Sequence, residues 1–533
     1  MLGHCNDDLE LQRRIQNFRD RGFHEDNIKL HPLNGGSEES YGYVHLGVPV
    51  GDSKYCLSEL QNLVAKFEKT CDCDLIVKSS QQKWNYLLWA IRQKFTYWFR
   101  NMCSSITSEV LPHIVAILKK KFSEVSNFEV TDVYWKQICL PIKHHGCGIS
   151  DPILMQNAAF VANVEETVKA TKDVLGSATY LDYMDVSKDL AEDHVFATDS
   201  IKQYVQGYRK LKQDIINASV GLGENIDEQR VTTLKQKRKL QHFYYDYLTA
   251  IAVKEYEDGI AASGSKHAKA RTFSNDGSFA GAWLFSVPKK GDMKMDNTSF
   301  RTALMLRLGV PFHDRPRTCK CNGLKIVDEH VDHLLCCKQN NGEIKGRHDA
   351  IVKDIKSLVN NAGLQFTDAR LGELRTVYHD DYKAADGCIR GLHEKPLHID
   401  VTVANPTGQS FLNVNLRGGN SSTIKHYAIK ERERIKNDKY LRRCQDINTE
   451  FMPLAFEIYG VASDSVDKLI QSLVSKASER TFVPYHVLLF YWRKRISYTL
   501  QYYNAWIINQ AYLKLNNCGG GNIHRDFDLE NIS

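Results

Sequence analysis

The chain has 533 residues, of which 42% are hydrophobic and 25% charged, and its formal net charge is +6. This composition is that of an ordinary globular protein and excludes a chain that is disordered throughout. At roughly 150 residues per domain, the length allows about three or four domains. The net charge is too small to identify a partner, so the places where basic residues gather matter more.

Fourteen cysteines occur in a chain whose first residues are polar and contain no apolar secretory segment. We therefore expect an intracellular protein in a reducing compartment, where clustered Cys and His residues bind metals rather than form disulfides. No apolar run reaches the roughly 18 residues that a membrane-spanning helix needs. The sequence thus predicts a soluble protein.

The first 300 residues are predicted to be mainly helical. From Leu57 to Phe122, apolar residues recur every three or four positions, which is typical of helices with one buried face. A turn-rich segment from Leu140 to Pro152 interrupts this pattern. Its adjacent histidines, His144 and His145, would point in different directions, so we interpret them as loop residues rather than metal ligands. Residues 180–262 are predicted to form long polar helices.

A basic run lies within these polar helices, directly before the aromatic segment His242–Tyr247. Such a combination could follow a nucleic-acid backbone and stack on its bases. A solvated helix face explains the same residues, so both interpretations stay open. The run comprises Arg230, Lys235, Lys237, Arg238 and Lys239.

Residues 319–337 contain a possible zinc knuckle. Three thiolates and one imidazole are a ligand set for tetrahedral Zn²⁺, and the candidates are Cys319, Cys321, His333 and Cys337. Cys336 competes with Cys337, and His330 with His333. Buried thiols that bind no metal explain the same residues. Basic residues nearby, among them Arg315 and Arg317, favour a knuckle that faces phosphate groups.

The segment after the knuckle predicts the element order α-β-β-β-α-β-α. A helix is expected over 347–361, strands over 364–377, 386–390 and 397–404, a helix over 421–444, a strand over 453–459 and a helix over 463–477. Asp386 and Asp400 would lie near the ends of neighbouring strands, where two carboxylates can share a Mg²⁺. Asp386 precedes a glycine and could instead form a turn. Asp400 sits in an apolar strand, where a carboxylate is costly to bury without a metal or partner.

The helix after these strands carries Lys436, Lys439 and Tyr440 on one face. A lysine there could orient water or stabilise a pentavalent phosphate, and neighbours such as Arg432 and Arg434 could hold a DNA backbone. A solvated basic helix explains the same residues.

Taken together, these features resemble the C-terminal part of non-long-terminal-repeat retrotransposon polyproteins that carry a restriction-like endonuclease. The resemblance rests on Val331-Asp-His-Leu-Leu-Cys-Cys337, Arg347-His-Asp-Ala350, Ala385-Asp386, Asp400-Val-Thr-Val403, Lys436 through Tyr440, and Phe451, Pro453, Glu457 and Gly460. Upstream, residues 46–51, 84–100 and 140–151 are similar to the strand, thumb and connector that follow the polymerase palm.

The resemblance implies a multidomain, mainly α fold that ends in an α/β domain of the restriction-endonuclease (PD-(D/E)xK) type. The implied parts are residues 1–55, the end of a palm; 56–150, a helical thumb; 151–300, a helical connector; 301–345, the knuckle; 346–480, the endonuclease domain; and 481–533, a helical tail. Structural Zn²⁺, catalytic Mg²⁺, a DNA target, element RNA and a nuclear location are implied with them.

For the reaction, the resemblance implies that Asp386 and Asp400 hold Mg²⁺ and that Lys436 or Lys439, with Tyr440, assists. Thr402 stands where many enzymes of this fold carry their lysine, so that role must shift to the helix. Supporting roles are implied for Glu373, Arg347 and His348. Arg347 and His348 would either support the active site or contact the DNA. The nick would expose a 3′-hydroxyl that primes reverse transcription.

Two departures and two alternatives accompany this interpretation. The chain lacks the early palm aspartate, and Cys5-Asn-Asp7-Asp8 lacks the aromatic of the polymerase turn, so we expect no DNA synthesis. A catalytically inactive zinc-dependent nucleic-acid-binding protein, from a decayed or host-recruited element, fits the same residues. A gene fragment that never accumulates as a folded protein is a further possibility.

Overall fold

A computed structural model describes residues 16, 42–51, 53–72, 78–175, 199–222, 240–289, 292–319, 321, 326–368, 385–413 and 419–516. Several candidate residues lie outside this part of the chain: Cys5, Asp7, Asp8, Arg230, Lys235, Lys237, Arg238, Lys239 and Glu373. The described residues are mainly helical with small sheets, as the predicted fold class requires. The chain divides into two compact units, residues 1–61 and 62–533.

The described part of the first unit contains a β-hairpin. Strands β1 (Gly42–His45) and β2 (Val48–Gly51) pair antiparallel, with His45 opposite Val48. Leu46 and Gly47 form the two-residue turn, and both have positive φ, at 49° and 80°. This turn matches the right-handed twist of the flanking strands. Helix α2 (Ser53–Cys71) follows.

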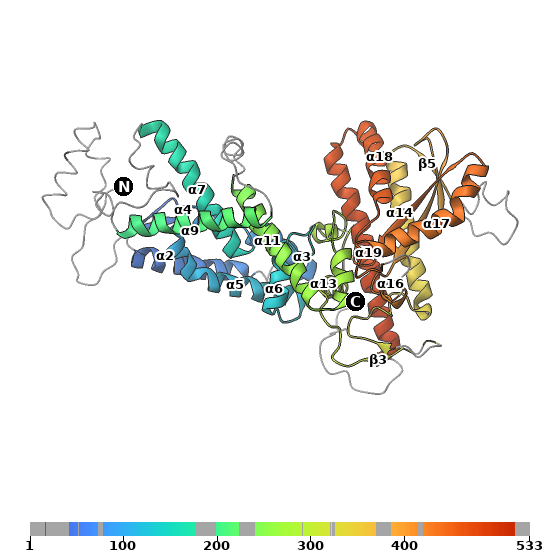
Figure 1. Ribbon diagram of the computed structural model, residues 1–533, viewed down its shortest axis with the longest axis horizontal. Coiled ribbons are helices and arrows are strands. Elements are labelled where there is room, and N and C mark those ends of the chain that lie inside the picture. Colours follow the sequence, from blue (N-terminus) through green and yellow to red (C-terminus); the bar gives the residue numbers. More distant parts are fainter. Residues whose placement is uncertain are drawn as a thin grey trace. The chain divides into compact units, whose positions relative to one another are not determined.

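The described residues between 78 and 308 are mainly helical (Figure 1). The helical elements are α3 (Ser80–Tyr86), the π-helical turn η2 (Leu87–Ile91), α4 (Thr96–Asn101), α5 (Ser104–Ser126), α6 (Asp132–Cys139), α7 (Pro152–Leu175), α9 (Asp199–Gly221), α11 (Leu240–Ala262), α12 (Lys266–Ser274), the 3₁₀ turn η3 (Ala282–Phe285) and α13 (Asn297–Leu308). Among the described helices, none combines the length and apolar character needed to cross a bilayer.

The aromatic residues of the early helices are core residues, as the helical spacing predicts. Trp84, Phe95, Phe99 and Phe122 are at most 1% exposed. Their rings meet edge-on or tilted, with centroids 5.2–6.1 Å apart for the pairs of Phe95 with Phe67 and Phe99 and of Trp84 with Phe122. Such contacts stabilise a core beyond the effect of burial alone.

In the part of the chain that the structure describes, the C-terminal elements follow the predicted order. Helix α14 (Asn341–Asn361) leads to a four-stranded sheet of order β5-β6-β7-β8, formed by β5 (Gln365–Asp368), β6 (Gly387–Arg390), β7 (Leu397–Ala404) and β8 (Glu450–Glu457). The short α16 (Gln409–Leu412) and then α17 (Tyr427–Asp446) connect β7 to β8, and α18 (Asp464–Thr481) follows. Strands β7 and β8 run parallel, and the other neighbours run antiparallel.

Alternation along β7 directs its side chains to two different layers. Leu397, Ile399 and Val401 join the core made with α14, α18 and a long final helix, α19 (Tyr485–Asn516). Helices α14, α18 and α19 lie side by side (Figure 1). Asp400 alternates with these residues and therefore faces the layer that contains α17, which contacts both β7 and β8.

Helix α19 is part of the core rather than a peripheral tail. The sequence predicts a helical tail over 481–533, and the described residues 485–516 are helical, but Trp492, Ile496 and Leu500 of this helix are buried in the main core. Polar contacts fix it as well, because Thr499 donates a hydrogen bond to Asp354 of α14, and Arg495 pairs with the same carboxylate at 3.0 Å. Thr499 and Arg495 are polar, so the sequence alone does not indicate that this part of the helix packs against α14.

A buried arginine, Arg307 of α13, joins three segments that are distant in sequence. Its guanidinium donates to the carbonyl oxygens of Ile142, Gly146 and Ala280 at 2.7–3.0 Å, and to Oδ1 of Asn275. Burial lowers the pKa of Arg307. Its own carbonyl accepts hydrogen bonds from the side chains of residues 137, 271 and 275. The turn-rich loop, the segment before η3 and α13 are therefore held together at this side chain.

We expect Arg307→Met to lower the free energy of unfolding by roughly 3 kcal/mol or more, because it leaves several buried carbonyls without a donor. Urea denaturation followed by circular dichroism measures this change. Arg480→Met is the matched control, since Arg480 also donates to two carbonyls, of Asn360 and Asn361, but from an exposed position. Equal losses in the two variants would contradict the role given to Arg307.

Candidate functional site

Asp386 and Asp400 lie on neighbouring strands, side by side. Strand β6 pairs Gly387 with Ile399, and continuing this register by one step places Asp386 opposite Asp400. The main-chain N–H of Asp386 donates to the carbonyl of Ile399 at 3.0 Å, which keeps the chain close to β7 before β6 begins. The bend at Asp386–Gly387 therefore leads directly into the strand.

The carboxylate of Asp386 is fixed from two directions. Its Oδ2 accepts the main-chain N–H of Val401 at 2.7 Å, so the side chain extends the hydrogen-bonding ladder beyond the end of β6. The same oxygen lies 2.9 Å from Nε2 of His348 on α14. Burial alone would lower the pKa of His348, but the hydrogen bond and charge of Asp386 raise it above the ordinary value. A protonated His348 would thus hold Asp386 in place.

Asp400 is buried and faces a lysine. Its side chain is 5% exposed, and its Oδ2 lies 2.6 Å from Nζ of Lys436 on α17. Burial raises the pKa of Asp400, the charge of Asp386 raises it further, and Lys436 and the Tyr440 hydroxyl act in the opposite direction. A cation between the two carboxylates would remove their mutual repulsion.

The structure distinguishes the two candidate lysines. Lys436 reaches Asp400, whereas Nζ of Lys439 donates to the hydroxyl of Tyr440 at 2.9 Å and lies 4.5 Å from the centre of its ring. Tyr440 is buried, and its ring packs on Phe451 with centroids 5.1 Å apart. Tyr440 therefore connects the helix, the sheet and Asp400, and Lys439 lies on its outer side.

The other candidate basic residues differ in how accessible they are to a DNA strand. Arg347 is 3% exposed and donates to Oδ1 of Asn504 in α19 at 2.7 Å, so it supports the interior and cannot contact DNA from there. Arg434 is held in ion pairs with Glu431 and Asp438, both at 2.5 Å. Arg432 is half-buried with its guanidinium 5.4 Å from the ring of Phe411. Arg315 and Arg317 are exposed.

One carboxylate near the site was not predicted from the sequence. Asp368 ends β5 opposite Gly387, so it lies one step from Asp386 across the strand pair. The sequence predicts a longer strand over 364–377, in which Asp368 is an interior residue. It therefore did not indicate that Asp368 lies close to Asp386. Glu373, the predicted third acid, lies outside the described residues.

Glu457 and Gly460, on which the resemblance also rests, support the fold. Glu457 is buried and accepts the N–H of Ile429 at 3.3 Å, and burial raises its pKa to about 7. Gly460 has φ of 120°, and a Cβ there would lie 2.6 Å from the carbonyl oxygen of Ala280. Only glycine permits this close approach.

The four predicted knuckle ligands come together. The ligand atoms of Cys319, Cys321, His333 and Cys337 all lie within 4.8 Å of one another. Sγ of Cys319 is 3.7 Å from Sγ of Cys337, and Sγ of Cys321 is 3.5 Å from Nε2 of His333. Among the described residues, these four form the one group of three or more His, Cys, Asp or Glu side chains that could hold a metal ion.

The competing ligands point elsewhere. Cys336 is exposed, and its thiol faces the carbonyl oxygens of Asp332 and His333 at 3.6 Å. The ring of His330 stacks on His267, with centroids 4.1 Å apart. The structure thus selects Cys337 and His333 from the alternatives that the spacing left open.

The chemistry of this cluster suits a metal ion. Burial raises the pKa of the Cys319 thiol to about 11, which disfavours a thiolate when no cation is present. A divalent metal reverses that preference, because coordination deprotonates the thiol. Three sulfurs and one imidazole nitrogen form the soft, four-ligand set of structural metal sites.

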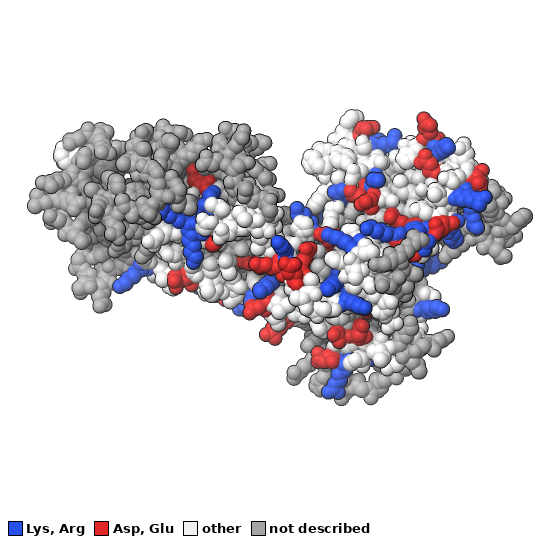
Figure 2. Space-filling view, in the orientation of Figure 1, with Lys and Arg blue, Asp and Glu red and all other residues white. Residues whose placement is uncertain are grey.

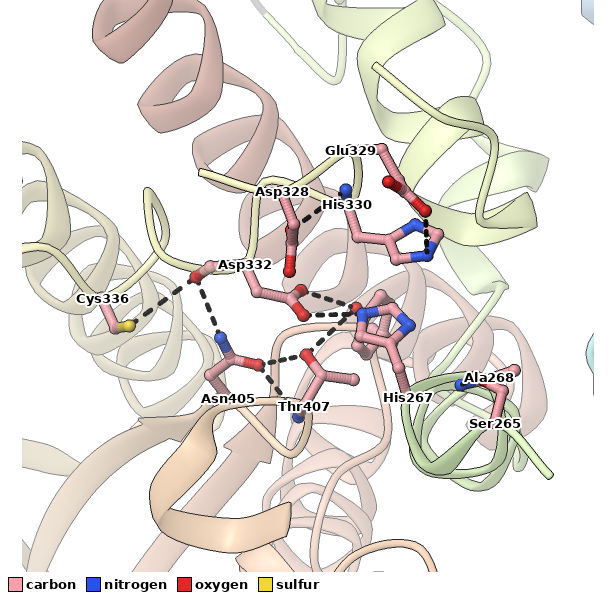
Figure 3. Close-up of polar contacts among 11 residues, drawn as sticks. Ser265, His267, Ala268, Asp328, Glu329, His330, Asp332, Cys336, Asn405 and Thr407 are labelled. Atoms are coloured by element: carbon pink, nitrogen blue, oxygen red, sulfur yellow. Dashed lines mark hydrogen bonds and ion pairs between the residues drawn. The ribbon is translucent and has the colours of Figure 1, made fainter. Parts of the chain in front are cut away.

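The cluster is fastened to the sheet through Asp332, next to the ligand His333 (Figure 3). Oδ2 of Asp332 lies 2.6 Å from Nε2 of His267 in α12, and Oδ1 accepts the hydroxyl of Tyr459 at 3.1 Å. Asn405, just after β7, donates to the carbonyl of Asp332 at 3.1 Å. Because Asn405 and Tyr459 follow the parallel strands β7 and β8, the knuckle is anchored at one end of the sheet.

We expect the purified chain to contain one divalent metal ion and Cys337→Ser to lose it, because the variant removes a ligand. Cys336→Ser is the matched control and should keep the ion. Elemental analysis gives the metal content, and thermal unfolding with and without a strong chelator gives the coupling to folding. Chelation should lower the unfolding temperature of the wild type and Cys336→Ser only. Equal metal contents in the two serine variants would rule out the ligand assignment.

Comparison with known proteins adds no family to this description. No protein-family model matches the chain, and no curated protein is similar to it. The geometry of the two sites therefore carries the functional argument that follows.

Proposed function

We propose that this chain is a metal-dependent endonuclease that nicks DNA, of the kind carried by non-long-terminal-repeat retroelements. The observation that carries the proposal is the placement of Asp386 opposite Asp400, with Nζ of Lys436 2.6 Å from Asp400. Two adjacent carboxylates and one lysine are the side chains that metal-assisted phosphodiester hydrolysis requires. In the retroelement setting, the nick supplies the 3′-hydroxyl for target-primed reverse transcription.

Asp386 and Asp400 fit a Mg²⁺ site. Mg²⁺ is commonly bound through one or two carboxylates, with water and substrate phosphate completing its coordination. When bound, the ion would polarise the scissile phosphate and lower the pKa of the attacking water. Asp386 is held ready for this role by His348 and by the N–H of Val401, and Asp400 by its buried position in β7.

Lys436 is the proposed electrostatic partner of the reaction. Its ammonium lies at the buried carboxylate, on the layer of the sheet where α17 packs. A cation held there can stabilise the negative charge that develops on the phosphate oxygens. Tyr440 orients this part of α17, because its ring is packed on Phe451 and its hydroxyl interacts with Asp400.

The knuckle is proposed to hold Zn²⁺ in a structural role. Its Cys₃His set leaves no protein ligand position vacant, as in closed structural sites rather than catalytic ones. The anchoring of Asp332 to Asn405 and Tyr459 connects the knuckle to the two strands that border the candidate active site. Zinc would therefore stabilise the end of the sheet at which β7 and β8 terminate.

We expect the full chain to convert supercoiled plasmid to the open circle with Mg²⁺, and Asp400→Asn to reduce the rate on the order of 10²-fold or more. Asparagine keeps the shape of the side chain and removes its charge. Asp464→Asn, in the exposed first turn of α18, is the matched control and should nick at the wild-type rate. Equal nicking by wild type and Asp400→Asn would remove the assignment. DNA binding without nicking by all three proteins would identify an inactive nucleic-acid-binding protein.

The two lysines are separated by a second experiment. We expect Lys436→Met to lower the nicking rate on the order of 10²-fold, and Lys439→Met to lower it less than about 10-fold, because Lys439 faces Tyr440 rather than Asp400. Lys436→Met also leaves a buried carboxylate without its partner and should destabilise the fold. The pair Lys436→Met with Asp400→Asn should recover stability, measured by thermal unfolding, but not nicking. A larger loss in Lys439→Met would reverse the assignment.

A further inference from the structure

An open groove of about 530 Å³ begins at the candidate active site and runs along α14. Asp386 and His348 lie at one end of this lining, and Lys353, Lys356 and Asn360 follow on later turns of the helix. Phe366 and Asp368 of β5 also line it. The groove therefore meets the site at Asp386, while Asp400 and Lys436 do not line it.

The charges of the groove are divided along its length. The carboxylates gather at the active-site end, because Asp349 neighbours His348 and Asp368 is paired with Gly387 beside Asp386. The two lysines lie farther along α14. A metal cation suits the first part, and an anion suits the second.

Lys353 and Lys356 differ from several basic residues of the surrounding helices. Arg493, Arg434 and Lys514 are each neutralised by a carboxylate at 2.5–2.7 Å. Lys353 and Lys356 are exposed, and the described structure gives neither of them an ion pair; Lys356 lies only over the ring of Phe366, at 5.9 Å. Two unneutralised ammonium groups therefore line a groove that ends at the proposed reaction centre.

Acidic and basic side chains are interspersed on the face shown in Figure 2 rather than gathered by sign. With a net charge of only +6, long-range attraction of DNA is modest. Local unpaired cations then matter more for holding a phosphate backbone.

We propose that Lys353 and Lys356 bind the backbone phosphates of the strand that is cut, so that this strand lies in the groove along α14. The inference rests on the proposed nuclease function. At about 1.5 Å per residue, His348 and Lys356 are roughly 12 Å apart along the helix. With one phosphate per about 3.4 Å of axis on each strand, the lysines reach phosphates about two to four nucleotides from the scissile one. The enzyme would therefore favour DNA in which the cut strand extends about four nucleotides from the nick toward Lys353 and Lys356.

The first test measures how DNA binding depends on salt, without divalent ions. Each phosphate contact adds about 0.7 to 0.9 to the slope of log affinity against log salt. Lys353→Gln with Lys356→Gln should reduce that slope by about 1.4 to 1.8. Lys468→Gln with Lys476→Gln, on α18 outside the groove, removes the same charge and should leave the slope unchanged. Equal slopes in the two double variants would overturn the inference.

The second test uses oligonucleotide duplexes that contain a mapped nick position and are shortened stepwise on either side. Wild type should show a raised KM when one side falls below about four nucleotides. The groove variant should show that raised KM already on long DNA, with kcat within a few-fold of wild type, because uniform binding is lost. A groove variant that still responds to shortening on that side would contradict the proposal. A wild-type chain that neither binds nor nicks DNA would instead refute the proposed function itself.

Discussion

The buried guanidinium of Arg307 is the constraint on which much of the larger unit depends. A charge in the interior is tolerated only when its donors are all used, and here carbonyl oxygens from two other segments accept them. These segments are the loop at residues 142–146 and the stretch before η3. Helix α13, which carries Arg307, also packs against α19. The early helices and the C-terminal sheet domain are thus joined through a polar contact rather than by apolar packing alone.

From that junction, α19 extends along α14 and α18 and positions the outer layer of the sheet. The polar residues inside this layer, including Asp354 and Asn504, have partners on the facing helix. A misplaced helix would leave each of them buried without a partner, which is costly. The packing therefore specifies one position for α14, and with it the position of His348 beside Asp386.

The two candidate sites share strand β7 and are supported differently. Asp400 lies in the middle of β7, where α17 supplies Lys436, whereas Asn405 and Tyr459 lie beyond the ends of β7 and β8 and hold the knuckle. Val331, at the start of the ligand segment, has φ of 56°, a rare conformation for a β-branched residue. This backbone turn precedes Asp332, whose contacts with the sheet and α12 compensate for it. The knuckle and the carboxylate pair are therefore parts of one folded body.

Much of the fold and several site residues were predictable because they depend on local patterns. Alternating apolar residues identified β7, three- and four-residue spacing identified the helices, and the burial of Asp400 followed from its place in an apolar strand. The ligand types of the knuckle were likewise visible in the sequence. The spacing alone could not choose between Cys336 and Cys337, because neighbouring residues differ only in the direction that the folded chain gives them.

The sequence by itself determined the order of the elements and the chemical types of the candidate ligands, since both are encoded within short stretches of chain. Tertiary structure alone decided that Lys436 meets Asp400, that Arg347 is buried, and that α19 belongs to the core. It also placed Lys353 and Lys356 in the groove that leads to Asp386. These outcomes depend on which faces of distant helices meet, and a buried polar side chain with a distant partner looks in sequence like one exposed to water.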